Sequence, residues 1–200
     1  APGIRHQREP ARTRLLLPAL GALILGLACG EAWTPGSESP EDLHRSAIVV
    51  DTHSDTTPRF EDPDWDFTER HPVEDGHMDL PRIREGGLDV QFWSIYMGKK
   101  EKEGEVIQEA LQRIDAVHRL VQENPQTLGL AMSVDEIREH VAAGRLANLM
   151  GVEGGHIIEN DLAVLRTYHR LGVRYLTLTH SFHTEWADSS GTSQDLEPLH

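Results

Sequence analysis

Histidine and aspartate alternate just after the apolar run 47–50, in the stretch Asp51-Thr-His53-Ser-Asp55. Residues two apart share a face of an extended chain, so His53 and Asp55 point the same way if the extension continues through them. An imidazole and a carboxylate together suit a divalent metal such as zinc, with Asp51 behind them as a partner that orients His53. The alternative is that the two aspartates only terminate the strand and that His53 is exposed.

A second carboxylate and a second histidine follow two later apolar runs. Glu153 follows the run 146–152 and precedes two glycines, and His180 follows the run 173–179. The carboxyl ends of parallel strands are where α/β folds place their sites, and a histidine there serves as a ligand, an acid/base or an oxyanion donor. The alternatives are an arginine partner for Glu153 and one loop hydrogen bond for His180. Three of the four predicted strands therefore end in His, Asp or Glu at one edge.

The elements that would position these residues alternate between strand and helix. Apolar runs predict strands, and helical spacing with capping residues predicts helices. The predicted strands are 47–50, 88–96, 146–152 and 173–179. The predicted helices are 105–123, a short helix that the Ser133 capping box opens and Gly144 closes, and 161–171. A long loop is predicted at 57–76. This order predicts a parallel sheet with helical crossovers, with a barrel and an open doubly wound sheet both left open.

Other candidate residues are weaker. His118, His140 and His169 fall on predicted helices, where surface or boundary positions are expected. No serine lies in a Gly-x-Ser-x-Gly elbow, which argues against a serine hydrolase. The single cysteine, Cys29, precedes the folded part and excludes an intrachain disulfide framework.

The amino-terminal residues are typical of an export segment. Four arginines precede the apolar run 15–28, which is shorter than the roughly 20 residues that a membrane span needs. Cys29 follows Gly-Leu-Ala and resembles the modified cysteine of a bacterial lipobox, with Gly26 departing from that motif; ordinary cleavage nearby is the alternative. We therefore expect residues 1–32 to direct export to the periplasm or cell envelope, 33–45 to form a linker and 46–200 to form the folded part.

Composition limits the partners of the chain. The 200 residues carry 19 Lys and Arg against 33 Asp and Glu, for a net charge of −14. This balance argues against nucleic acid as a partner, because phosphate binding needs a basic face. A mean hydropathy of −0.45 argues against a polytopic membrane protein. We therefore expect the chain to associate with a membrane only through a lipid anchor.

Four stretches together resemble the membrane dipeptidase (renal dipeptidase) family of zinc peptidases. They are VVDTHSD at 49–55, GHMDLPRIREGGLDVQFWSIY at 76–96, GVEGGHII at 151–158 and GVRYLTLTHSFHTEWADSS at 172–190. The resemblance implies a (β/α)₈ TIM-type barrel whose complete site binds two Zn²⁺ ions. It implies that His53 and Asp55 bind one zinc, that Glu153 bridges both, and that His180 contacts the substrate and stabilises the tetrahedral intermediate. The implied reaction is hydrolysis of dipeptides, often with a D-residue at the carboxyl position, by a hydroxide held on the metals.

The resemblance covers only the amino-terminal half of such a barrel. Two further zinc histidines and a proton-handling acid are not found here, and neither His183 nor His200 is assigned to them. We expect an incomplete active site, and we expect the 200 residues alone to be unstable or to self-associate through open sheet edges. A homodimer is a further expectation. The alternatives are a non-catalytic exported protein and another metal-dependent amidohydrolase, although those usually carry His-x-His where this chain has His53 and Asp55.

Overall fold

The computed structural model describes residues 39–98, 100 and 102–191. The predicted export segment and Cys29 lie outside the described residues. The helices are α1 (Pro40–Ser46), α2 (Leu80–Gly86), α3 (Glu105–Glu123), α4 (Val134–Ala142) and α5 (Leu162–Arg170), with 3₁₀ turns η1 (Thr57–Glu61) and η2 (Gly155–Ile158). The strands are β1 (Val50–Ser54), β2 (Val90–Ile95), β3 (Leu128–Leu130), β4 (Leu146–Val152) and β5 (Val173–Leu176).

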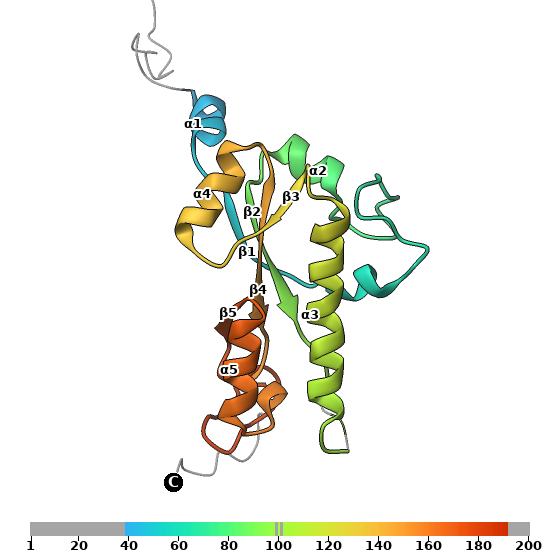
Figure 1. Cartoon of the computed structure of the whole chain (residues 1–200), viewed down its shortest axis with the longest axis vertical. Helices are drawn as coiled ribbons and strands as arrows, with labels where there is room; N and C mark the ends of the chain where they lie inside the picture. The colour runs from blue at the N-terminus through green and yellow to red at the C-terminus, as the bar shows by residue number, and fades with distance from the viewer. Residues whose placement is uncertain (1–38, 99, 101, 192–200) are drawn as a thin grey trace, which may run out of the picture. The chain divides into compact units, whose positions relative to one another are not determined.

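Every strand pairing in the described sheet is parallel, as the alternation of strands and helices predicts. β1 pairs with β2, and β2 pairs along its full length with β4. On its other edge β4 pairs with β3 over its first residues and with β5 over its last. The strand order β1-β2-β4-β5 follows the chain, with the short β3 beside the start of β4, which is the arrangement of a partial barrel. Figure 1 shows α3 on one side of these strands and α4 on the other.

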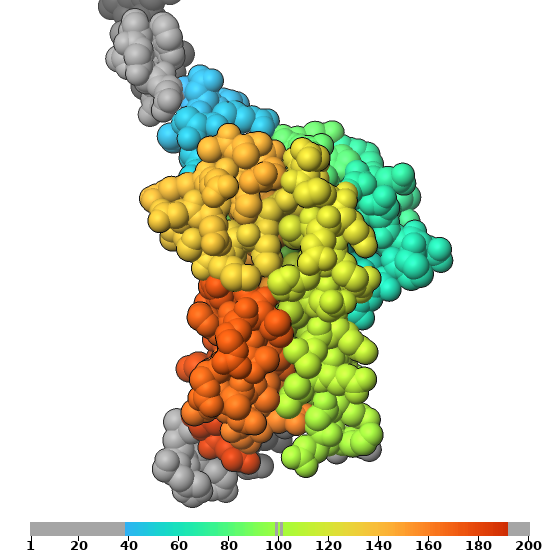
Figure 2. Space-filling view, viewed as in Figure 1, coloured from blue at the N-terminus to red at the C-terminus, as the bar shows by residue number. Residues whose placement is uncertain are grey.

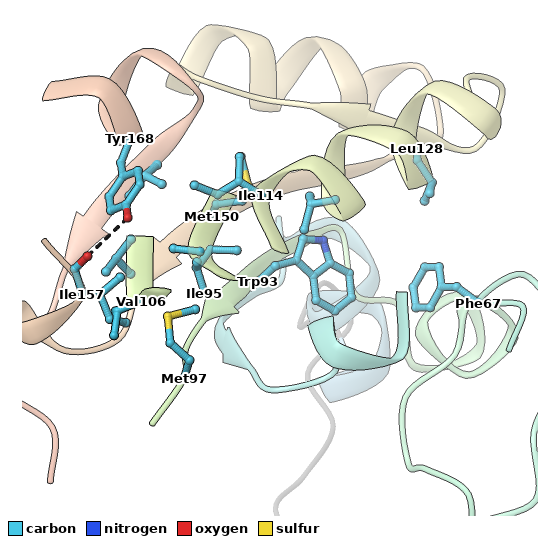
Figure 3. Close-up of a cluster of buried hydrophobic side chains, with 14 of the residues drawn as sticks. Phe67, Trp93, Ile95, Met97, Val106, Ile114, Leu128, Met150, Ile157 and Tyr168 are labelled. Atoms are coloured by element: carbon cyan, nitrogen blue, oxygen red, sulfur yellow. Dashed lines mark hydrogen bonds between the residues drawn. The ribbon is translucent and has the colours of Figure 1, made fainter. Parts of the chain in front are cut away.

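The main core lies between the sheet and the helices α3 and α5. Trp93 and Ile95 of β2 and Met150 of β4 are fully buried there, against Ile114 of α3 and Tyr168 of α5 (Figure 3). A smaller cluster of Val90, Ala131, Ala147 and Leu149 lies on the other face and is covered by α4. In the space-filling view the surfaces of α3 and α5 adjoin along the visible face (Figure 2). The two faces of the sheet are therefore covered unequally.

Capping residues set the helix ends. The predicted caps are confirmed, because the Ser133 side chain accepts from the N–H of Glu136 and Asp161 from that of Ala163. Helix α2 was not predicted, although its signals are in the sequence: Asp79 caps it, a proline occupies its first turn, and Gly87 ends it at a φ of 70°. The Asp79 side chain is fully buried and pairs with the guanidinium of Arg82. This cap fixes the chain that enters β2.

Four expectations about the elements were wrong in part, and one strand was missed. The first strand was predicted at 47–50 and as buried, whereas β1 spans Val50–Ser54 and lies at an edge of the sheet. Val50 is 47% exposed there, because no strand of the described chain covers that side. The last strand ends at Leu176 rather than at residue 179, and β3 was missed because three residues give no periodicity. Helix α1 replaces the end of the expected linker, since Ser39 caps it and Pro40 suits its first turn. The expected loop 57–76 begins with the turn η1.

None of the helices among the described residues combines the length and the apolar character needed to cross a membrane.

Candidate metal centre

A β-bulge in β1 sets the direction of its polar side chains. Asp51 pairs with Gln91 and Ser54 with Trp93, so β1 has one residue more than β2 between these pairs. Such an extra residue bends a strand and changes the face to which the following side chains point. Ser54 is buried, whereas His53 is exposed on the strand beside it. The extension continues through His53 but ends at Ser54, so Asp55 lies in the turn that follows β1 and the alternation expected for the pair holds only for His53.

Three of the predicted site residues meet at the carboxyl ends of the strands. The Nε2 atom of His53 lies 3.2 Å from Oδ1 of Asp55 and 3.4 Å from Oε2 of Glu153. One donor atom from each of the three residues lies within 4.8 Å of the other two. An imidazole nitrogen and two carboxylate oxygens are donors that zinc accepts, so this group fits a divalent cation. The side chain of Glu153 is 13% exposed, and those of His53 and Asp55 are open to solvent at 38% and 58%.

Glu153 uses its two oxygens for different neighbours. Its Oε2 accepts a hydrogen bond from the Ser94 hydroxyl at 2.9 Å and faces His53, while its Oε1 lies 3.2 Å from Nε2 of His180. The alternative interpretation of Glu153 was an ion pair with an arginine, and no arginine is among its contacts in the described residues. His180 follows β5 in a loop, with its side chain 56% exposed and its Nδ1 3.1 Å from the Ser181 hydroxyl. The structure therefore brings His180 beside the group of His53, Asp55 and Glu153.

The partner of the His53 ring differs from the expected one. Asp51 accepts a hydrogen bond from the backbone N–H of His53 at 3.0 Å rather than from its imidazole. The Nδ1 atom of that ring instead lies 2.9 Å from the hydroxyl of Tyr175 on β5. Sequence reasoning missed both Tyr175 and Ser94. Neither β2 nor β5 marks its hydroxyl residue by a local pattern, because Gln91 and Arg174 make other positions of these strands polar as well.

The charge of the site is negative. Burial raises the pKa of Tyr175 to about 12, and the carboxylates of Glu153, Asp55 and Asp51 add to that rise. Burial and then the carboxylate of Asp55 also raise the pKa of Tyr96. Both shifts have the sign that neighbouring anions produce on a phenol. A bound cation would offset this concentration of negative charge.

Two of the three histidines that were set aside have backbone partners outside this group. Nε2 of His118 on α3 is 2.7 Å from the carbonyl oxygen of Leu171, and Nε2 of His140 on α4 is 3.0 Å from that of Leu130. Each is bonded to backbone, as expected for a boundary position. Neither belongs to the group of potential metal ligands found among the described residues.

Comparison with known sequences places most of the chain in one family. The sequence model of the membrane dipeptidase family, peptidase family M19, matches residues 38–198. The dipeptidase aclJ of Aspergillus oryzae is 40% identical over 133 residues, which make up 62% of this chain and 31% of that protein. The chain thus spans about a third of the length of the curated relatives it matches.

Solved structures share the fold. The probable dipeptidase PvdM of Pseudomonas aeruginosa has a TM-score of 0.67 at 23% identity, over 75% of this chain and 39% of that one. The dipeptidase AC, a metallopeptidase, has a TM-score of 0.59 at 27% identity, over 70% of this chain and 44% of that one. The described residues thus correspond to part of a longer barrel.

Proposed function

Because this chain belongs to the membrane dipeptidase family, we propose that the full-length protein hydrolyses dipeptides at a metal centre held in part by His53, Asp55 and Glu153. The observation that carries the proposal is the convergence of these three side chains from two strand ends a hundred residues apart in the chain. Nothing in the packing of the apolar core requires an imidazole and two carboxylates at one point. Their meeting is explained by a cation that all three bind.

Each residue has a proposed part in the site. His53 through Nε2 and Asp55 would hold one ion, and Glu153, whose two oxygens face different neighbours, would link it to a second. The hydrogen bond from Ser94 fixes the Glu153 carboxylate. Two bound zinc ions would supply Lewis acidity and an activated water near neutral pH.

His180 is the proposed substrate contact. Its side chain is largely exposed beside Glu153, and its imidazole offers an N–H donor to the peptide carbonyl oxygen. Such a donor stabilises charge that develops on that oxygen during attack, and removal of one comparable donor costs other enzymes about 3–4 kcal/mol. A dipeptide whose scissile carbonyl oxygen accepts from His180 is the proposed substrate.

Location is a separate proposal. Residues 1–32 are proposed to export the protein, and Cys29 is proposed as the point of lipid attachment. Both lie outside the described residues.

Activity of the purified full-length protein tests the proposed function. We expect hydrolysis of L-alanyl-L-alanine and L-alanyl-D-alanine, loss of activity with a chelator, and recovery on addition of zinc. Glu153→Gln removes the charge of the proposed bridge and is expected to lower kcat/KM at least about 100-fold. Glu139→Gln makes the same change on the exposed surface of α4 and should leave activity unchanged.

Two outcomes would contradict the proposal. One is chelator-resistant hydrolysis, or equal activity of Glu153→Gln and wild type. The other is a zinc content near zero with no hydrolysis of any dipeptide, which would favour a non-catalytic protein with the same fold.

A further inference from the structure

The Tyr175 side chain crosses the sheet from β5 to β1. Its ring lies over β4 at Gly151, where an added Cβ would be 1.9 Å from the ring carbon Cζ. The ring of Phe92 on β2 is beside it, with the two ring centroids 5.6 Å apart. Only a residue without a side chain at position 151 leaves room for this path. Gly151 and Tyr175 are therefore a matched pair that brings a hydroxyl from one strand to another.

The hydroxyl of Tyr175 ends between two groups of β1. It donates to the carbonyl oxygen of Thr52 at 3.2 Å and lies 2.9 Å from Nδ1 of His53. A phenol has a single proton to donate, so the hydroxyl that donates to Thr52 is left with its lone pairs for His53. The ring nitrogen Nδ1 then carries the proton and donates it to the tyrosine oxygen. The other nitrogen, Nε2, is then unprotonated, and its lone pair would face a cation held beside the carboxylate oxygens of Asp55 and Glu153, which lie 3.2 and 3.4 Å from it.

We propose that Tyr175 is a positioning residue for His53: by accepting from Nδ1–H and bonding to Thr52, it fixes the imidazole in the orientation and tautomer that present Nε2 to a metal ion. This inference rests on the proposed metal centre. Ligating histidines commonly donate their second N–H to an oxygen acceptor, and loss of such an acceptor weakens metal affinity by about 10–100-fold. Here the acceptor is Tyr175 on β5, at the opposite edge of the sheet from β1. The orientation of the His53 ring on β1 therefore depends on the pairing of β5 with β4.

The test compares zinc affinity in wild type and Tyr175→Phe, both as full-length protein. The variant keeps the ring that packs on Gly151 and removes only the hydroxyl. Competition with a chromophoric chelator is expected to give a zinc dissociation constant about 10-fold higher for Tyr175→Phe than for wild type. In the Co²⁺-loaded protein, the exchangeable Nδ1–H signal of His53 is expected in wild type and should be lost or broadened in the variant, because no acceptor slows its exchange with water.

Tyr168→Phe is the matched control. The Tyr168 hydroxyl donates to the carbonyl oxygen of Ile157 at 3.2 Å inside the main core, as drawn in Figure 3. Its loss removes one buried hydrogen bond that involves none of the candidate ligands, so zinc affinity and the His53 signal should not change. A merely structural effect of losing a hydroxyl would appear in both variants.

The outcomes separate the inference from the proposed function. If wild type takes up zinc and Tyr175→Phe binds it as tightly, with the same Nδ1–H signal, Tyr175 does not position His53. If wild type takes up no zinc, the metal centre itself is wrong and the inference is overturned with it.

Discussion

Replacing Gly151 by alanine is the most direct test of how β4 makes room for the site. The new Cβ would lie 1.9 Å from Cζ of Tyr175 and 2.2 and 2.3 Å from its two Cε atoms. Carbon atoms in contact prefer about 3.5–4.0 Å, so the ring has to move by about 1.5 Å or more. A shift of that size takes the hydroxyl out of hydrogen-bond range of His53, which it now contacts at 2.9 Å.

The free energies involved favour a clear loss of stability. Forcing an extra carbon into a packed site costs about 1–3 kcal/mol, and a lost hydrogen bond adds about 1 kcal/mol. Alanine in place of glycine within a strand recovers about 0.5–1 kcal/mol of backbone entropy. We therefore expect Gly151→Ala to lower the free energy of unfolding by about 1–3 kcal/mol and to weaken zinc binding.

Urea denaturation of the full-length protein, with a chelator titration beside it, measures both effects. Gly86→Ala is the control, because no atom lies within 4 Å of the Cβ that it adds at the exposed end of α2. That variant should be as stable as wild type or slightly more so. A Gly151→Ala protein within about 0.5 kcal/mol of wild type, with unchanged zinc affinity, would refute the described path of Tyr175.

Two further predictions concern buried polar groups of the fold. Burial raises the pKa of Asp79, but two backbone N–H donors and the charge of Arg82 outweigh it and hold that pKa below its usual value. The carboxylate therefore stabilises the fold fully above about pH 4, and less as the pH falls through its folded pKa. In acid denaturation profiles, the difference in free energy of unfolding between wild type and Asp79→Asn should shrink as the pH falls. A difference that grows below pH 4 would contradict the lowered pKa of Asp79. Asn148 is fully buried and accepts from the indole N–H of Trp93 at 2.9 Å, so Asn148→Ala should cost about 2–4 kcal/mol in urea denaturation, and a cost below about 1 kcal/mol would show that the indole finds another acceptor.

The location of the site could be predicted because strand direction fixes it. Parallel strands end at one edge, so residues 53, 55 and 153 were expected together before any contact was known. The clustering of their donor atoms in the structure agrees with that expectation. The predicted roles of these residues, and of His180, stay predictions.

What the sequence did not predict depends on distances across strands. Tyr175 reaches His53 only because Gly151 lies between them, and no local pattern in either strand encodes a contact over 122 residues. The bulge in β1 is equally invisible, since it is defined by the register with Gln91 and Trp93. Local patterns of hydrophobic and capping residues predict the helices and strands. The contacts between side chains depend on which strands pair and in which register.

The open edges of the sheet follow from the part of the barrel that the chain covers. Ile48 before β1 and Val50 within it are each 47% exposed, and Leu178 is 63% exposed beyond β5. In a closed barrel such positions are covered by neighbouring strands. The expected self-association of the 200 residues alone stays a prediction, which size-exclusion chromatography of that segment would check.

Anomalous diffraction at the zinc edge, from crystals of the full-length protein grown with zinc, would show whether His53, Asp55 and Glu153 bind a metal ion. We expect a peak about 2.0–2.2 Å from Nε2 of His53 and from carboxylate oxygens of Asp55 and Glu153. A zinc peak bound by other residues, with these three side chains free of it, would overturn the proposed metal centre.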